Sequence, residues 1–337
     1  MTGPFIIDLE GSELSAEERD RLQHPWVGGV ILFARNFQDL AQLKALTSSI
    51  HALRPDNPLL ITVDHEGGRI QRFREGFTKL PSFRSLGERL PPLASTTHEA
   101  SDCAALELAL SEARTAGADL AFELRAVGVD FSYTPVLDLD YGRSQVIGDR
   151  SFHREPAFVS MLAAAMAQGL AMAGFRTCGK HFPGHGWAEA DSHHALPVDD
   201  RPLDAILHDD AWPYARLGRG RFERALLQSV MPAHVVYSQV DSLPAGFSRI
   251  WVTDILKGQL GFEGVVISDD LSMAGAAVFD DIADRCEAAF AAGCDATLIC
   301  NRPDLSVKAL DTVPGRTPAF LTDPSRRSLS LLRPRSV

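Results

Sequence analysis

The chain has 337 residues, of which 45% are hydrophobic and 23% charged, and its formal net charge is −11 at pH 7. This composition is that of a globular protein, and the acidic balance argues against a general binder of nucleic acid or of anionic membranes. No basic and apolar leader follows Met1, and no apolar run approaches the ~18 residues that a membrane helix needs. The five cysteines form no Cys-x-x-Cys pair, which favours reduced thiols and a cytoplasmic location.

Short runs rich in Val, Ile and Leu alternate with amphipathic stretches along the chain. The runs lack a clean polar alternation, which is typical of strands covered on both faces. The expected strands are Phe5–Leu9, Val30–Phe33, Leu59–Val63, Val129–Pro135, Phe175–Cys178, Leu226–Pro232, Val265–Ser268 and Ala296–Cys300. The expected helices include Ser15–Gln23, Leu40–Leu53, Glu107–Val127, Pro156–Ala173, Ile250–Leu260 and Asp281–Ala292.

This alternation predicts an α/β fold, and its length and strand count favour a (β/α)8 TIM barrel. A doubly wound open sheet would show the same alternation and stays open as the alternative. No linker rich in Gly, Ser or Pro divides the chain, so we expect a single domain over residues 1–337. Residues from about 315 to 337 are expected to form a tail or a helix on the barrel exterior.

Polar residues follow nearly every predicted strand. They are Asp8 and Glu10, Arg35-Asn36, Asp64 to Arg69, Asp138, Lys180-His181, His234, Asp269-Asp270 and Asn301-Arg302. In a barrel of parallel strands these positions share one rim, which is where such folds place their active sites. This distribution favours an enzyme over a purely structural or binding protein.

The segment from Lys180 to His193 contains a candidate proton carrier. Asp191 and His193 are two residues apart, and a carboxylate bonded to an imidazole fixes the ring tautomer and raises the histidine pKa from its ordinary value near ~6.5. Such a pair would transfer protons near neutral pH. The further histidines His181, His185 and His194 leave a metal site open as an alternative.

Metal and cofactor motifs are otherwise missing from the sequence. The first strand carries no His-x-His pair, and the histidine cluster lies among prolines and glycines, which hold ligand geometry poorly. The sequence contains neither a G-x-S-x-G elbow nor an H-E-x-x-H helix. We therefore expect no metal and no cofactor.

Asp269 is the candidate nucleophile. A carboxylate at the end of a buried strand points into the rim of a barrel, where it can attack an electrophilic carbon. The alternative is that Asp269 or Asp270 only caps the following helix. Two adjacent aspartates can fill both roles, one facing the pocket and the other binding the backbone.

Five segments together resemble a known family. They are Asp64-His65-Glu66-Gly67-Gly68-Arg69-Ile70-Gln71-Arg72, Gly148-Asp149-Arg150-Ser151-Phe152, Lys180 to His193, Met231-Pro232-Ala233-His234-Val235, and Ile267-Ser268-Asp269-Asp270-Leu271-Ser272-Met273. The chain resembles, over about residues 3–302, the bacterial β-N-acetylhexosaminidases of glycoside hydrolase family 3, the single-domain NagZ type. Lys-His-Phe-Pro-Gly-His-Gly followed by Asp-Ser-His is highly specific.

The resemblance implies a retaining glycosidase that acts on terminal β-linked N-acetylglucosamine. By the family pattern Asp269 would be the nucleophile, and His193 the general acid/base tuned by Asp191. The same pattern implies that the sugar is bound by Asp64, Arg72, Arg150, Lys180 and His181. It also implies a small-molecule glycan substrate, namely the muropeptide N-acetylglucosamine on 1,6-anhydro-N-acetylmuramic acid of peptidoglycan recycling.

The reaction itself leaves one alternative open. Retaining glycosidases usually place two carboxylates about 5–5.5 Å apart, whereas this sequence offers one nucleophilic carboxylate and an Asp–His pair. A neutral histidine does not repel an incoming anion, so phosphate could replace water and the enzyme would be a phosphorylase. A metal-dependent barrel hydrolase is the further alternative.

Overall fold

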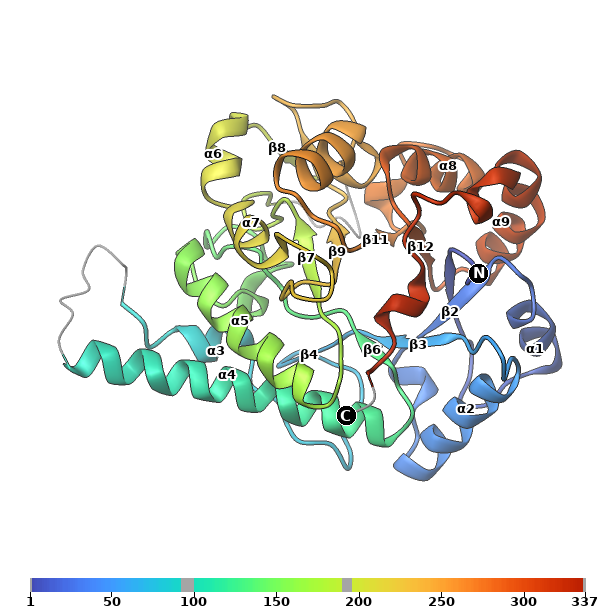
Figure 1. Ribbon diagram of the computed structural model, residues 1–337, viewed down its shortest axis with the longest axis horizontal. Helices are drawn as coiled ribbons and strands as arrows, with labels where there is room; N and C mark the ends of the chain where they lie inside the picture. Colours follow the sequence, from blue (N-terminus) through green and yellow to red (C-terminus); the bar gives the residue numbers. More distant parts are fainter. Residues whose placement is uncertain (1, 92–99, 190–195, 336–337) are drawn as a thin grey trace.

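The computed structural model describes residues 2–91, 100–189 and 196–335 of the chain. Parallel strands form one sheet in the order β6-β3-β2-β1-β12-β11-β9-β7, and helices surround it (Figure 1). The two ends of this order also meet: Cys178 N donates to Thr134 O at 2.8 Å, and Leu137 N donates to Lys180 O at 2.7 Å. The sheet is therefore closed on itself, which confirms the (β/α)8 barrel and excludes the open sheet.

The barrel strands are β1 Phe5–Asp8, β2 Val27–Leu32, β3 Leu60–Val63, β6 Phe131–Ser132, β7 Cys178–Phe182, β9 Ser229–Pro232, β11 Val265–Asp270 and β12 Ala296–Ile299. Two small additional pairs are β4 His65–Gly67 with β5 Ile70–Gln71, and β8 Val198–Asp199 with β10 Val236–Tyr237. The α-helices are α1 Ala16–Leu22, α2 Leu40–Ala52, α3 Phe83–Gly87, α4 Ala100–Ala126, α5 Pro156–Met172, α6 Leu203–His208, α7 Trp212–Gly218, α8 Ile282–Ala292 and α9 Pro303–Arg316. Residues Ile250–Gln259 form a π-helix.

The predicted strands all correspond to barrel strands, but the fifth is displaced. The sequence places it at Phe175–Cys178, whereas β7 spans Cys178–Phe182. Lys180 and His181 therefore lie within the strand and not after it. Charged residues are typical of loops, which is why the sequence places these two after the strand. Both side chains nevertheless face the mouth of the barrel, where polar groups are tolerated.

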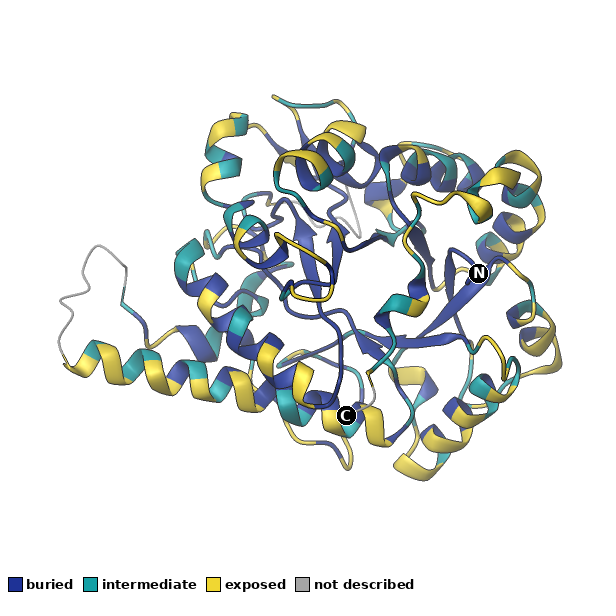
Figure 2. Cartoon of the chain, in the orientation of Figure 1, coloured by how far each residue is buried: buried dark blue, intermediate teal, exposed yellow. Residues whose placement is uncertain are grey.

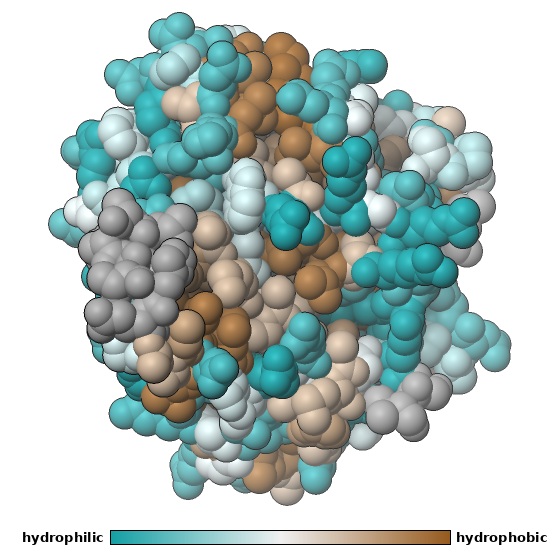
Figure 3. Space-filling view, turned by 60° about the vertical axis from the view of Figure 1, so that its left-hand side comes forward, coloured by the Kyte–Doolittle hydropathy of each residue, from teal (hydrophilic) through white to brown (hydrophobic). Residues whose placement is uncertain are grey.

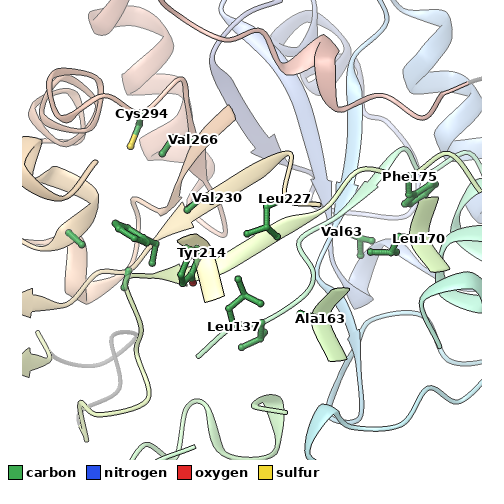
Figure 4. Packing of buried hydrophobic residues seen from close by; sticks show 14 of the residues in the cluster. Val63, Leu137, Ala163, Leu170, Phe175, Tyr214, Leu227, Val230, Val266 and Cys294 are labelled. Atoms are coloured by element: carbon green, nitrogen blue, oxygen red, sulfur yellow. The ribbon is translucent and has the colours of Figure 1, made fainter. Parts of the chain in front are cut away.

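Successive strand residues alternate between two apolar layers, as expected from the two-residue period of a strand. Phe5 and Ile7 pack in the layer between strands and helices, whereas Ile6 belongs to a separate cluster in the barrel interior. Val266 on β11 likewise packs in the outer layer, which also contains Val230 and other residues shown in Figure 4. Burying both layers makes the strands the most deeply buried part of the chain (Figure 2).

The C-terminal tail covers the end of the barrel at which the strands begin, opposite the C-terminal ends of the strands. After α9 the chain forms two short 3-10 turns, η7 Pro318–Thr322 and η8 Leu329–Leu332. Leu329 and Leu332 are fully buried and belong to the interior cluster with Ile6 and Phe131. Where the sequence analysis expects a tail or a helix on the barrel exterior, the structure has these two turns, and their Leu residues pack against the interior cluster of the barrel.

The helices α4 and α5 cross at very short distance on one side of the barrel. A Cβ added to Gly169 would lie 2.0 Å from Arg114 O, and one added to Gly117 would lie 2.3 Å from Met166 O. Apolar surface on this side occurs as separate patches among hydrophilic residues (Figure 3). In the described part of the chain, no helix is long and apolar enough to span a membrane.

Candidate active site

A single pocket at the C-terminal ends of the strands gathers the predicted residues that the structure describes. Asp64 follows β3, Lys180 and His181 lie on β7, and Asp269 lies on β11; Arg72 and Arg150 reach the pocket from loops after β3 and β6. All six line the same pocket. Asp191 and His193 lie outside the described residues.

Lys180 and Arg150 are held by a buried carboxylate, that of Glu66. Lys180 Nζ is 2.6 Å from Glu66 Oε1 and 2.7 Å from Asp64 Oδ1. The Arg150 guanidinium forms a bidentate pair with Glu66, with Nε–Oε2 at 2.9 Å and Nη2–Oε1 at 2.8 Å. This network fixes both cations at the pocket wall, where they can donate to hydroxyl groups.

The charges of this network stabilise one another. Burial alone would raise the pKa of Glu66, but Arg150 and Lys180 hold that pKa well below its usual range. Burial alone would lower the pKa of Lys180, but Asp64 and Glu66 raise it above its usual value. Glu66 and Lys180 are therefore both charged near neutral pH.

Asp64 joins the network to the pocket mouth. Its Oδ2 lies 3.6 Å from Arg72 Nη2, and its side chain is 26% exposed. Arg72 also lies over the Phe33 ring, with the guanidinium carbon 5.6 Å from the ring centroid. Asp64 thus presents acceptors, and Arg72 donors, to the same opening.

Asp138 positions the loop after β7. Its Oδ2 accepts a hydrogen bond from His181 Nδ1 at 2.7 Å, and its Oδ1 accepts the backbone N–H groups of His181 at 3.1 Å and His185 at 2.7 Å. Burial alone would raise the pKa of Asp138, but His181 and His185 lower it overall. With Nδ1 bound to Asp138, His181 turns its Nε2 away from that carboxylate.

The two adjacent aspartates have different surroundings. Asp269 lines the pocket, and its Oδ1 accepts the backbone N–H of Asp270 at 2.8 Å. Both carboxylate oxygens of Asp270 accept protein donors, namely Ser272 N at 2.9 Å, Cys300 N at 3.0 Å and Ser272 Oγ at 2.7 Å. Asp270 therefore ties β11 to the turn that follows it and to β12.

Burial raises the pKa of Asp270 to about 7. His234, whose pKa burial lowers, donates Nε2–H to Asp270 O at 3.1 Å. This neutral imidazole and the Asp270 carboxyl hold the end of β11 from two sides, and so fix the backbone that carries Asp269.

Three contributors were missed as site residues by sequence reasoning: Glu66, Asp138 and His185. Glu66 and Asp138 are buried carboxylates that contact site cations or site backbone, and His185 lines the pocket with its pKa lowered by burial to about 4. The available signal was their position at strand ends next to predicted site residues. Among the described residues no group of three or more His, Cys, Asp or Glu is placed to hold a metal ion.

Comparison with known proteins places the chain in a family. The model for the glycosyl hydrolase family 3 N-terminal domain matches residues 6–315. A β-hexosaminidase of Bordetella avium is 58% identical over 318 residues, which are 94% of this chain and 86% of the relative.

Solved structures agree with that match. The structure of native NagZ from Neisseria gonorrhoeae is 46% identical with a TM-score of 0.85, covering 100% of this chain and 91% of that one. The same protein in complex with N-trifluoroacetyl-D-glucosamine is 45% identical with a TM-score of 0.82, covering 97% and 91%. The chain therefore belongs to glycosyl hydrolase family 3, among its β-hexosaminidases.

Proposed function

We propose that the chain is a retaining β-N-acetylglucosaminidase that releases terminal β-linked N-acetylglucosamine by double displacement. The observation that carries this proposal is the pocket itself, in which Asp269 faces a wall of fixed donors and acceptors. The bound N-trifluoroacetyl-D-glucosamine in the Neisseria relative supports an N-acylated amino sugar as the group bound here.

The wall suits the hydroxyl groups of a pyranose ring. The Lys180 ammonium has three donors, and Asp64 and Glu66 account for two of them. The third donor, the pocket side of Asp64 and the Arg150 guanidinium then supply complementary partners for vicinal hydroxyls. Holding the ring in this way sets the anomeric carbon against Asp269 and lowers the entropic part of the barrier.

The first chemical step forms one bond and breaks one. A carboxylate oxygen of Asp269 bonds to the anomeric carbon as the bond to the leaving oxygen breaks, and His193, kept cationic by Asp191, gives its proton to that oxygen. In the second step neutral His193 takes a proton from water, which attacks the anomeric carbon and frees Asp269. The anomeric configuration is thereby retained.

We further propose that the substrate is an N-acetylglucosaminyl-1,6-anhydro-N-acetylmuramic acid muropeptide, met in the cytoplasm during peptidoglycan recycling. The test is turnover of a nitrophenyl β-N-acetylglucosaminide and of the muropeptide disaccharide, with product anomers followed by NMR. We expect the β-anomer to form first. An initial α-anomer, or no turnover of either glycoside, would contradict the proposal.

Two further arms separate competing reactions. The same NMR assay with added inorganic phosphate detects N-acetylglucosamine 1-phosphate, whose predominance would make the enzyme a phosphorylase. Treatment with a chelator leaves the proposed mechanism active, whereas lost activity that Zn²⁺ restores would indicate a metal-dependent hydrolase.

A further inference from the structure

Asn301, at the mouth of the pocket, has an unusual backbone conformation. Its φ of 59° makes it the one residue other than glycine with positive φ in the described part of the chain. Left-handed backbone costs energy for residues with a Cβ, although Asn tolerates it best, and such conformations persist where the surroundings enforce them. Asn301 lies two residues after the end of β12 and lines the pocket.

Residues from the ends of two other strands, β1 and β2, enforce this conformation. The Asp8 carboxylate, at the end of β1, accepts the backbone N–H of Asn301 at 2.8 Å. Arg35, after β2, pairs with Asp8 and donates from Nη1 to Asn301 Oδ1 at 2.9 Å. Arg35 Nε also donates to Leu9 O at 2.9 Å, so the guanidinium is itself fixed on a third side.

These contacts also orient the side-chain amide. A guanidinium only donates hydrogen bonds, so the atom of Asn301 that faces Arg35 must be its oxygen. The amide nitrogen Nδ2 then points the other way, and no acceptor for it occurs among the described residues. The cluster therefore presents one oriented N–H donor at an exposed position of the pocket.

The location of this donor indicates which part of a substrate it meets. Lys180 and His181, which line the closed part of the pocket, are only 1% and 7% exposed, whereas Asn301 is exposed. Strand β12 is paired with β11, which carries Asp269. Asn301 thus lines the same pocket as Asp269 from the neighbouring strand and on its exposed side, toward which a group attached to the anomeric carbon can extend.

We propose that Asn301 forms part of an aglycone subsite, in which its Nδ2–H donates to an oxygen of the second sugar of the substrate. Asp8 and Arg35 are the positioning residues of this subsite. The proposal rests on the proposed function, since it requires a glycoside to be cleaved at Asp269. It adds a contact to the substrate beyond those proposed to hold the terminal sugar.

The informative variant is Asn301→Asp. Aspartate keeps an oxygen toward Arg35 and tolerates left-handed backbone, but it replaces the Nδ2–H donor with an acceptor. Asn301→Gly keeps the backbone conformation and removes the whole side chain. Asp304→Asn serves as the matched control, because this exposed residue near the start of α9 pairs only with Arg302 among the described residues.

The experiment compares kcat/KM for a nitrophenyl β-N-acetylglucosaminide with that for a disaccharide whose second unit is an N-acetylated sugar. We expect both Asn301 variants to lose about tenfold on the disaccharide, as for one lost hydrogen bond, and less than about twofold on the nitrophenyl glycoside. Asp304→Asn should match the wild type on both substrates.

Equal losses of kcat/KM on both substrates would place Asn301 against the terminal sugar. Unchanged kcat/KM on both would show that Asn301 makes no substrate contact. Either result overturns the aglycone subsite. Melting temperatures of the variants show whether a loss reflects folding, because unfolding would lower both activities together. A wild-type chain inactive on both glycosides would instead overturn the proposed function, and the subsite with it.

Discussion

Replacing Glu66 by Gln should destabilise the protein strongly although the change in shape is minimal. Glu66 is 2% exposed and accepts one hydrogen bond from Lys180 and two from Arg150. In the variant, Lys180 keeps its ion pair with Asp64 at 2.7 Å. Within the described residues, the other hydrogen bond of Arg150 is to Val146 O at 3.4 Å, so its charge loses its main compensation.

The size of the effect follows from that imbalance. Removing one partner of a buried ion pair typically costs 3–5 kcal/mol, because the remaining charge stays desolvated. The Gln carbonyl still accepts one hydrogen bond, so we expect the free energy of unfolding to decrease by about 3 kcal/mol, at the lower end of that range. We also expect kcat/KM to fall about 100-fold, because Arg150 is no longer held against the sugar.

The assay is urea denaturation followed by circular dichroism, with activity measured in the absence of denaturant. Glu223→Gln is the control, because Glu223 pairs with Arg176 and Arg335 but is 58% exposed. Exposed pairs contribute at most about 1 kcal/mol. A loss for Glu66→Gln no larger than that of the control would refute the structural role given to the buried network.

Three further changes test other parts of the structure. Burial lowers the pKa of His65 to about 3. Below pH ~6.5 the unfolded chain therefore binds a proton at this residue that the folded chain does not, so the stability of the wild type decreases as the pH is lowered. In urea titrations, the stability of His65→Gln relative to the wild type should increase by about 1.4 kcal/mol for each pH unit from pH 6.5 down to 4.5. The same slope of stability against pH for the wild type and for His65→Gln would contradict the burial of His65. Leu332→Ala should lower the free energy of unfolding by about 2–5 kcal/mol in the same denaturation assay, because Leu332 is fully buried in the barrel interior. A decrease below about 1 kcal/mol would mean that the tail is not packed there. His193→Ala should slow glycosides with poor leaving groups far more than nitrophenyl glycosides, whereas equal losses would show that His193 is not the acid.

Much of the fold could be predicted because hydrophobic period and strand-end polarity are local signals. Runs such as Leu59–Val63 are apolar on both faces, and a barrel buries both faces. The shift of β7 shows where this reasoning fails. Lys180 is a strand residue with a charged side chain, and only the carboxylates of Asp64 and Glu66, more than a hundred residues away, make its burial tolerable.

Some residues of the candidate site could likewise be predicted from the sequence, and others could not. That Asp269 and Lys180 line one pocket could be predicted from the sequence, because both motifs come near the C-terminal ends of predicted strands. Glu66, Asp138 and Asp8 act through contacts that join distant segments, such as Asp8 with Asn301, and no spacing in the sequence encodes those pairings. Residues that hold other residues are therefore visible mainly in the structure.

The proposed double displacement depends most on Asp269 as the nucleophile. The direct measurement is incubation with a 2-fluoro glycoside that carries an activated leaving group, followed by proteolysis and mass spectrometry of the peptides. We expect one sugar per chain, attached to the peptide that contains Asp269, and no label on the Asp269→Ala variant. Normal turnover of N-acetylglucosaminides without any label on Asp269 would contradict double displacement, and would indicate instead that the acetamido oxygen of the substrate acts as the nucleophile.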